Sequence, residues 1–228
     1  MTETVAMLHT SFVFVNVDTV FKDLFAELLP NAKVVDFVDS QILATVQQEG
    51  TISSRSVRRM CYLAQAAEAA EADVIFSACS SLGPAIDVAR KLVSVPIVKV
   101  DDRMAQEAVK RSDRIGVLAT VSSTLDPTVG LIQTAASSAG RSVHVTPKLA
   151  NGAFAELMSG NPEHHDAMVS AAAEELARGV DLIVLAQASM ARLAPRLASE
   201  SGHEVLSSPR LGVQELARVL AERVASRA

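Results

Sequence analysis

The sequence predicts an α/β fold made of two similar parallel-sheet domains. Two observations carry this prediction: short apolar runs alternate with helix-period segments along the chain, and two strand-like segments recur about 110 residues later. Short apolar runs are typical of parallel strands that helices cover on both faces. Ligands of such sheets bind outside the carboxyl ends of the strands. The residues that follow each strand are therefore where a site is expected.

The first part of the chain alternates between the two patterns. An amphipathic segment ends at Pro30, which cannot continue a helix. A longer segment rich in Ala, Glu and Arg follows Ser53, a residue type typical of helix N-caps. Pro84 lies in the first turn of the next helix, where proline is tolerated. The expected elements are strand 5–8, helix 18–29, strand 33–37, helix 54–71, strand 73–76, helix 83–93 and strand 96–100.

The second part of the chain continues the alternation. The apolar runs RIGVLA and DLIVL are the clearest strands, and the Asn151–Gly152 pair marks a turn. The expected elements are helix 103–111, strand 114–119, helix 126–139, strand 142–146, helix 163–178, strand 181–185, helix 189–199 and helix 211–226.

Two pairs of segments form an internal repeat. Segment 72–82 matches 180–190 at an offset of 108 residues, and 5–10 matches 115–120 at an offset of 110. Apolar strands resemble one another, so chance is the alternative. Two matches at nearly the same offset favour a duplicated unit.

The duplication sets the expected domain organisation. We expect one domain from residues 1–105 with 209–228, and a second from 106–208. A pseudo-two-fold axis would make the strand-end loops of the two domains face each other across a cleft. In that arrangement Cys79 would lie opposite Gln187, and the functional site would lie in the cleft.

Composition excludes several classes of protein. The net charge of −5 and the low aromatic content of 4% argue against a nucleic-acid partner, and the charge also argues against an anionic membrane. Two cysteines are too few for a disulfide framework or a structural zinc site. The N-terminus lacks the pattern of a signal peptide, and no apolar run approaches the roughly 20 residues of a membrane span. We therefore expect a cytoplasmic protein.

Cys79 is the main candidate for acid/base chemistry. It follows an apolar strand and precedes a helix, where backbone N–H groups and the positive helix end can lower the pKa of a thiol. A buried structural thiol is the alternative. Cys61 lies in the middle of a helix pattern, so we expect it to serve packing.

Gln187 and His9 are the candidate partners of Cys79. A carboxamide exchanges no proton at neutral pH, but Gln187 can donate and accept hydrogen bonds. His9 follows the first strand and has a ring suited to acid/base work, although a satisfied structural histidine is the commoner case. We expect His164 and His165 to lie at the surface, because adjacent positions on a helix do not make a zinc pair.

Small hydroxyl side chains cluster after the strands and are expected to bind a carboxylate. Such residues in turns expose N–H groups and hydroxyls that hold anions. Ordinary turn and helix-cap chemistry prefers the same residues and is the alternative. The candidate substrate-binding residues are Ser11, Ser80, Ser81, Thr120, Ser122, Ser123 and Ser189. No metal ligand set, phosphate loop or nucleophile elbow is found in the sequence.

With these motifs in order, the chain resembles the aspartate/glutamate/hydantoin racemase superfamily over essentially its full length. The resemblance rests on DVIFSACSS at 73–81, RIGVLATVSST at 114–124 and DLIVLAQAS at 181–189. It implies a cofactor-independent enzyme and a homodimer or higher homo-oligomer. It also implies two cysteines that act on opposite faces of the substrate. Here Gln187 stands at the second cysteine position, so plain two-base racemisation is not expected.

The expected function is that of a racemase or isomerase-like enzyme acting next to the carboxylate of a small acid. Cys79 would be the acid/base and Gln187 a hydrogen-bonding partner. A single-cysteine lyase or decarboxylase on the same site is the first alternative. A protein that binds small carboxylates without catalysis is the second.

Overall fold

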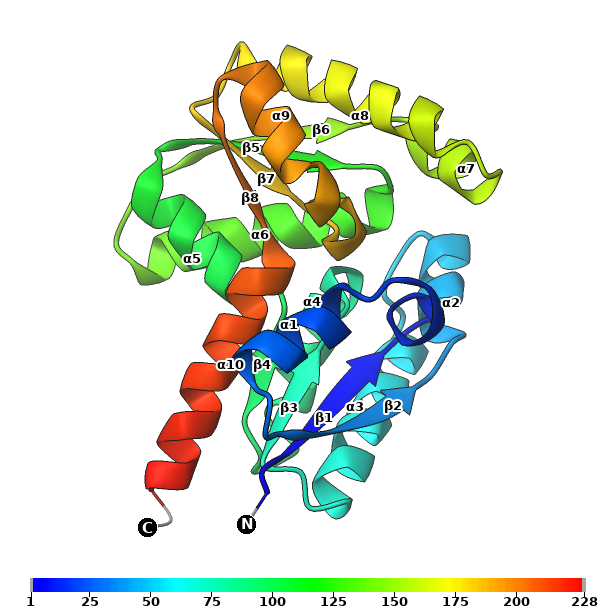
Figure 1. Ribbon diagram of the computed structural model, residues 1–228, viewed down its shortest axis with the longest axis vertical. Helices are drawn as coiled ribbons and strands as arrows, with labels where there is room; N and C mark the ends of the chain where they lie inside the picture. The colour runs from blue at the N-terminus through cyan, green and yellow to red at the C-terminus, as the bar shows by residue number, and fades with distance from the viewer. Residues whose placement is uncertain (1, 227–228) are drawn as a thin grey trace. The chain divides into compact units, whose positions relative to one another are not determined.

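Two four-stranded parallel sheets, each covered by helices, form the core of the protein (Figure 1). The structure is a computed structural model that describes residues 2–226. Contacts within the chain divide it into two units. Unit 1 comprises the chain up to Val100 together with the residues from Pro209 onward, and unit 2 comprises Asp101–Ser208. The α/β class predicted from the sequence is confirmed.

The sheet of unit 1 has the strand order β2-β1-β3-β4, with every pair parallel. Its strands are β1 (Thr4–His9), β2 (Lys33–Val38), β3 (Val74–Ser77) and β4 (Ile97–Lys99). Its helices are α1 (Val20–Leu28), α2 (Ile42–Glu49), α3 (Ser54–Ala69), α4 (Gly83–Ala89) and α10 (Ser208–Ala225), which begins at the border with unit 2.

Helices cover both faces of the unit 1 sheet. Side chains alternate along a strand, so Ala6 and Leu8 face α2, α3 and α4 in one apolar cluster. Met7 faces the other way, towards α1, where Phe21 and Phe25 pack edge-on against Phe76. Helix α10 lies on this second face, because Arg210 donates two hydrogen bonds to a glutamate of α1. Both faces of the central strands β1 and β3 are buried, as is typical of parallel sheets, whereas the edge strand β2 is partly exposed.

Unit 2 repeats the layout of unit 1. Its sheet has the order β6-β5-β7-β8, again all parallel. Its strands are β5 (Arg114–Ala119), β6 (His144–Leu149), β7 (Leu182–Leu185) and β8 (Glu204–Ser207). Its helices are α5 (Asp102–Arg111), α6 (Ser122–Ser138), α7 (Ala153–Met158), α8 (Pro162–Ala177) and α9 (Ala194–Ser201).

Strand pairing gives the repeat a structural basis. Val5 pairs with Val74 in unit 1, and Ile115 pairs with Leu182 in unit 2. These are the positions that the offsets of 110 and 108 residues relate. The same equivalence holds at the far side of each sheet, where Ile75 pairs with Ile97 and Ile183 pairs with Val205. The two sheets therefore share order, direction and register.

Some elements differ from the sequence-based expectation. The sequence analysis did not identify the short helices α2 and α7, of 8 and 6 residues, or the strand β8, whose four residues include only two apolar ones. Helix α6 begins at Ser122, ahead of Pro127, instead of at residue 126. The expected helix 189–199 is divided into a 3-10 turn, η3 (Ala188–Leu193), and α9, whose first turn carries Pro195. Proline lacks the N–H that would continue a helix across this boundary.

Candidate functional site

Cys79 lies in the turn that follows β3 in unit 1. The neighbouring Ala78 N–H donates to the Leu8 carbonyl at 3.2 Å and so continues the sheet for one residue. Cys79 itself is extended, with φ −120° and ψ 108°, and a short 3-10 turn, η2 (Ser80–Leu82), follows it. The Cys79 carbonyl closes this turn by accepting from the Leu82 N–H at 3.3 Å. The thiol is half-buried at the carboxyl end of a central strand.

Gln187 occupies the equivalent place after β7 in unit 2. Ala186 N–H donates to the Leu118 carbonyl at 2.9 Å, and the Gln187 carbonyl accepts from Met190 N–H at 3.0 Å. The backbone of Gln187 is also extended, with φ −124° and ψ 133°, and η3 follows it. Cys79 and Gln187 therefore start the same kind of turn from the same strand position in their respective units.

The side chain of Gln187 is held by Thr120. The Gln187 Oε1 accepts from the Thr120 backbone N–H at 2.7 Å and lies 3.1 Å from its hydroxyl. The Gln187 Nε2 donates to the same hydroxyl oxygen at 2.9 Å. The Gln187 Oε1 thus accepts hydrogen bonds from the backbone N–H and the hydroxyl of Thr120, a residue that the sequence analysis assigned to a substrate carboxylate. In this arrangement Thr120 is engaged within unit 2.

The first turn of α6 offers further donors beside Thr120. The first N–H groups of a helix have no partner within the helix, and no side chain caps α6. Ser122 is exposed there. The hydroxyl of Ser123 is buried and has no hydrogen-bond partner within residues 2–226. An anion placed at this helix end would meet N–H groups, hydroxyls and the positive end of the helix dipole.

The remaining predicted hydroxyls fall into two kinds. Ser80 and Ser81 are buried in the turn directly after Cys79, at 7% and 4% exposure. Ser189 is half-buried in η3, the matching turn of unit 2. Ser11 instead supports its own loop, because its hydroxyl lies 3.4 Å from the Val13 N–H. The structure therefore places three of these four serines beside Cys79 or Gln187 in their own units.

His9 is buried and paired with a carboxylate. Its Nε2 lies 2.8 Å from Asp36 Oδ1, and its Nδ1 has no hydrogen-bond partner among the described residues. By strand alternation His9 shares the α1 face of the sheet with Met7. Cys79 packs against the apolar cluster on the opposite face. A role for His9 as a second base stays a prediction, and this placement argues against it.

The sequence analysis missed a buried cation near Cys79. Lys99, at the end of β4, is 4% exposed, and its Nζ donates to both carboxylate oxygens of Asp87 at 3.0 and 3.1 Å. A Cβ placed on Gly83, which directly follows η2, would lie 3.8 Å from this Nζ. The ammonium therefore lies against the start of α4, close to the turn that carries Cys79. A lysine inside an otherwise apolar strand was the available signal.

A second ionic cluster supports the turn of Gln187 in unit 2. Arg192, in η3, donates to both oxygens of Asp166 at 2.6 Å, and His165 Nδ1 lies 2.7 Å from the same carboxylate. These hydrogen bonds, that of Arg192 above all, lower the pKa of Asp166. The expectation that His165 lies at the surface was wrong: it is 2% exposed, whereas His164 is exposed.

Cys61 behaves as the sequence predicted. It lies on the buried face of α3, at 6% exposure, within the apolar cluster of unit 1. Burial raises the pKa of its thiol. Raising the pKa lowers the reactivity of a thiol at neutral pH, which fits a packing role for Cys61.

Neither a metal-binding cluster nor a membrane-spanning helix occurs among the described residues. No three or more His, Cys, Asp and Glu side chains within residues 2–226 are grouped so as to hold a metal ion. Among the same residues, no helix has both the length and the apolar character needed to span a membrane.

Comparisons with known proteins agree with this architecture. A family model described as Asp/Glu/Hydantoin racemase matches residues 18–216. A glutamate racemase isoform from Bacillus anthracis has 15% identity and a TM-score of 0.75, over 97% of this chain and 82% of that one. A glutamate racemase from Francisella tularensis, in complex with D-glutamate, has 15% identity and a TM-score of 0.74, over 98% and 82%. An allantoin racemase from Klebsiella pneumoniae has 15% identity and a TM-score of 0.71, over 96% and 88%. No curated protein matches the chain by sequence.

Proposed function

Because the chain belongs to the Asp/Glu/hydantoin racemase family, we propose that it is a cofactor-independent isomerase of the racemase type. Its substrate is a small acid, and the reaction occurs at the carbon next to the carboxylate. Solved structures with the same fold include a glutamate racemase in complex with D-glutamate and an allantoin racemase. The first of these names an amino acid, D-glutamate, as the bound ligand, which supports a small acid as the substrate.

The observation that carries the proposal is the equivalence of Cys79 and Gln187. Two turns of the same geometry follow the equivalent strands, and one of them presents a thiol while the other presents an amide. A thiol can accept and return a proton near neutral pH, whereas a carboxamide cannot. In this proposal the Cys79 thiolate removes the proton next to the carboxylate. Isomerisation then requires that a proton reach the opposite face of the planar enediolate from solvent or a further group, because return of the proton by Cys79 alone restores the starting isomer.

Loss of that proton leaves an enediolate, so the substrate carboxylate must be held by hydrogen-bond donors. The start of α6 supplies such donors, with Ser122 and Ser123 and their N–H groups. In the proposal Ser80 and Ser81 add donors in the turn of Cys79, and Ser189 adds one in the turn of Gln187. Gln187 fixes the Thr120 loop and offers its second amide hydrogen to the substrate.

A second candidate function follows from the missing second thiol. With one acid/base group, protonation from a single face suffices for a lyase or a decarboxylase. Such an enzyme would use the same residues: Cys79 would deliver a proton to the carbanion left after bond cleavage. A protein that binds small carboxylates without catalysis is the remaining alternative.

Proton NMR in D2O separates these functions. The enzyme is incubated with a panel of chiral amino, hydroxy and dicarboxylic acids, and the α-proton signal is followed. Disappearance of this signal that requires Cys79 supports the proposal. Retained configuration indicates one-base exchange, and inversion indicates that a further group acts on the other face. Loss of CO2 or another carbon fragment indicates the lyase.

The matched control is the second cysteine. Cys79→Ala is expected to lower exchange by about 10²-fold or more, whereas Cys61→Ala, which also removes a thiol from unit 1, is expected to keep it. A Cys79→Ala variant that exchanges protons as fast as the wild type would overturn the assignment. Binding of a panel acid without any exchange would favour the non-catalytic alternative.

A further inference from the structure

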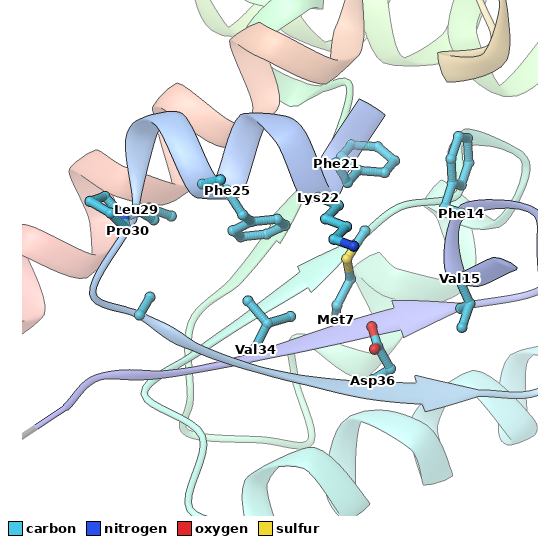
Figure 2. A pocket seen from close by; sticks show the side chains of 12 residues that line it. Met7, Phe14, Val15, Phe21, Lys22, Phe25, Leu29, Pro30, Val34 and Asp36 are labelled. Atoms are coloured by element: carbon cyan, nitrogen blue, oxygen red, sulfur yellow. The ribbon is translucent and has the colours of Figure 1, made fainter. Parts of the chain in front are cut away.

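A pocket of about 320 Å³ lies in unit 1 between α1 and the edge strand β2 (Figure 2). Small-molecule sites span roughly 300–1,000 Å³, so this volume suits a ligand of few atoms. Its lining comes from β1, β2, α1 and the π-helical turn η1 (Val13–Val17). Neither the family comparison nor the proposed function makes use of this pocket.

Most of the pocket wall is apolar and partly rigid. Phe14 packs edge-on against Phe21 with 4.8 Å between ring centroids, and Phe21 packs in turn against the buried Phe76 at 5.6 Å. Phe25, Leu29 and Val34 line the other end (Figure 2). Rings fixed in this way supply apolar contact with little loss of side-chain freedom on binding.

The pocket is also rimmed by exposed apolar groups. Val15 of η1 and Val34 of β2 both line it and are 40% and 37% exposed. Phe12, directly before η1, is 51% exposed, and Val13, the first residue of η1, is 41% exposed. Contiguous exposed apolar surface is typical of binding sites. Single π-helical turns are rare and are frequent at functional sites.

Two opposite charges enter the pocket from facing walls. Lys22 reaches down from α1, and Asp36 points up from β2, towards the same part of the pocket beside Met7 (Figure 2). Lys22 makes no hydrogen bond or ion pair within residues 2–226. Asp36 uses one carboxylate oxygen for His9. The cation and the anion therefore approach a common space without pairing with each other.

We propose that this pocket binds a free α-amino acid with an apolar side chain, such as leucine. The ligand carboxylate would pair with the Lys22 ammonium, and its ammonium would pair with the Asp36 carboxylate. The apolar side chain would lie against Phe25, Leu29 and Val34. A simple carboxylic acid would be attracted by Lys22 but repelled by Asp36, and a simple amine would be attracted by Asp36 but repelled by Lys22. A zwitterion can form an ion pair with each of the two side chains.

This ligand site is separate from the candidate catalytic residue Cys79. The pocket opens on the α1 face of the unit 1 sheet, where Met7 and Asp36 point. Cys79 packs on the α3 and α4 face of the same sheet. The proposal therefore does not depend on the proposed function, and binding can be tested in a protein that lacks the Cys79 thiol.

The test is isothermal titration calorimetry on the Cys79→Ala variant with L-leucine, N-acetyl-L-leucine and L-leucinamide. The acetyl group removes the positive charge and the amide removes the negative charge of the same side chain. We expect saturable 1:1 binding of leucine and, from the loss of a charge-assisted contact, about tenfold weaker binding of each derivative. Binding of the derivatives as tight as that of leucine would overturn the proposal.

Three substitutions locate the site. Lys22→Gln and Asp36→Asn are each expected to weaken leucine binding about tenfold, and asparagine keeps an oxygen for His9. Lys33→Gln, an exposed lysine of β2 outside the pocket, is the matched control and is expected to change nothing. Circular dichroism checks that each variant is folded.

Two outcomes count against the proposal. The first is absence of saturable binding for leucine, methionine, valine and phenylalanine. The second is that a second copy of the chain covers the pocket. In that case sedimentation would show a dimer that Ala26→Trp, placed on the pocket wall, dissociates, and leucine would not bind.

Discussion

Units 1 and 2 share a scaffold and differ in the chemical group at the start of the turn that follows the equivalent strands β3 and β7. Sheet order, strand direction and pairing register are the same in both. The turns after β3 and β7 begin with residues of nearly the same backbone angles. Yet unit 1 places the Cys79 thiol there, and unit 2 places the Gln187 amide hydrogen-bonded to Thr120. A fold fixes where a group lies, and the side chain alone decides what it does.

The cores of the two units also differ at one equivalent strand position. Ala6 lies in β1, and Gly116 occupies its place in β5. A Cβ on Gly116 would lie 2.8 Å from the Leu176 side chain of α8. In unit 2 the Leu176 side chain therefore packs directly against the backbone of β5 at Gly116, where the strand residue has no side chain. The two sheets therefore keep the same topology although the space at this position is filled by a strand side chain in unit 1 and by a helix side chain in unit 2.

The largest effect is expected from removing the reactive group of unit 1. Cys79→Ala should lower α-proton exchange by about 10²–10⁴-fold, the usual contribution of a general acid or base. Gln187→Ala should lower it far less, because the amide moves no proton. Exchange rates in D2O for the two variants provide the comparison. Equal losses of exchange rate in the two variants would contradict the proposal that Cys79 moves the proton and Gln187 does not.

Restoring chemical symmetry is the next test. Gln187→Cys gives unit 2 the thiol that unit 1 already has. We expect exchange accompanied by inversion to rise by up to about 10²-fold, the lower end of the usual contribution of a general acid or base. Chiral chromatography of the product measures this. Titration with Ellman's reagent shows that the new thiol is accessible. Unchanged stereochemistry of the product in a folded variant with an accessible thiol would contradict the functional equivalence of positions 79 and 187.

A core substitution tests the packing difference between the sheets. Gly116→Ala should reduce the free energy of unfolding by roughly 1–3 kcal/mol, because the added methyl meets Leu176 at 2.8 Å. Chemical denaturation followed by circular dichroism measures the loss. Combining it with Leu176→Ala should recover part of the stability, whereas two additive losses would show that Leu176 is not the obstacle.

The smallest effect is expected at the ionic cluster beside the turn of Gln187. Asp166→Asn should reduce the free energy of unfolding by about 1–2 kcal/mol at pH 7, because Arg192 and His165 lose a charged partner. The folded-state pKa of Asp166 is lowered, so its contribution is present above the unfolded value of about 3.9 and is lost as the pH falls through the folded value. Unfolding curves of wild type and variant should therefore converge in acid. A constant difference down to pH 2 would contradict this assignment.

Sequence patterns predicted most of the fold because apolar strands and helix periodicity are strong local signals. The strand 114–119 has the bounds that the structure shows, and Ser53 accepts a hydrogen bond from the Ser56 N–H at the start of α3. Strand β8 lacks such a signal, because only Val205 and Leu206 of its four residues are apolar. The turn positions of Cys79 and Gln187 followed from the repeat.

Side-chain pairing could not be predicted in the same way. The hydrogen bonds between Gln187 and Thr120 and between His9 and Asp36 join residues 67 and 27 positions apart. The buried Lys99–Asp87 pair and the pocket beneath α1 likewise depend on how helices pack. Such contacts are set by tertiary packing, which no local pattern encodes.

The division of unit 1 between two distant parts of the chain has a consequence for biosynthesis. Helix α10 follows the whole of unit 2 in the chain, yet its Gly212 lies so near Val100 that a Cβ there would be 2.5 Å from the Val100 carbonyl oxygen. On the ribosome, the first hundred residues emerge long before the helix that completes their unit. Unit 2, continuous in the chain, is free to fold during translation, whereas the nascent unit 1 must wait for its final helix. Chaperone dependence is thus expected to concentrate in unit 1.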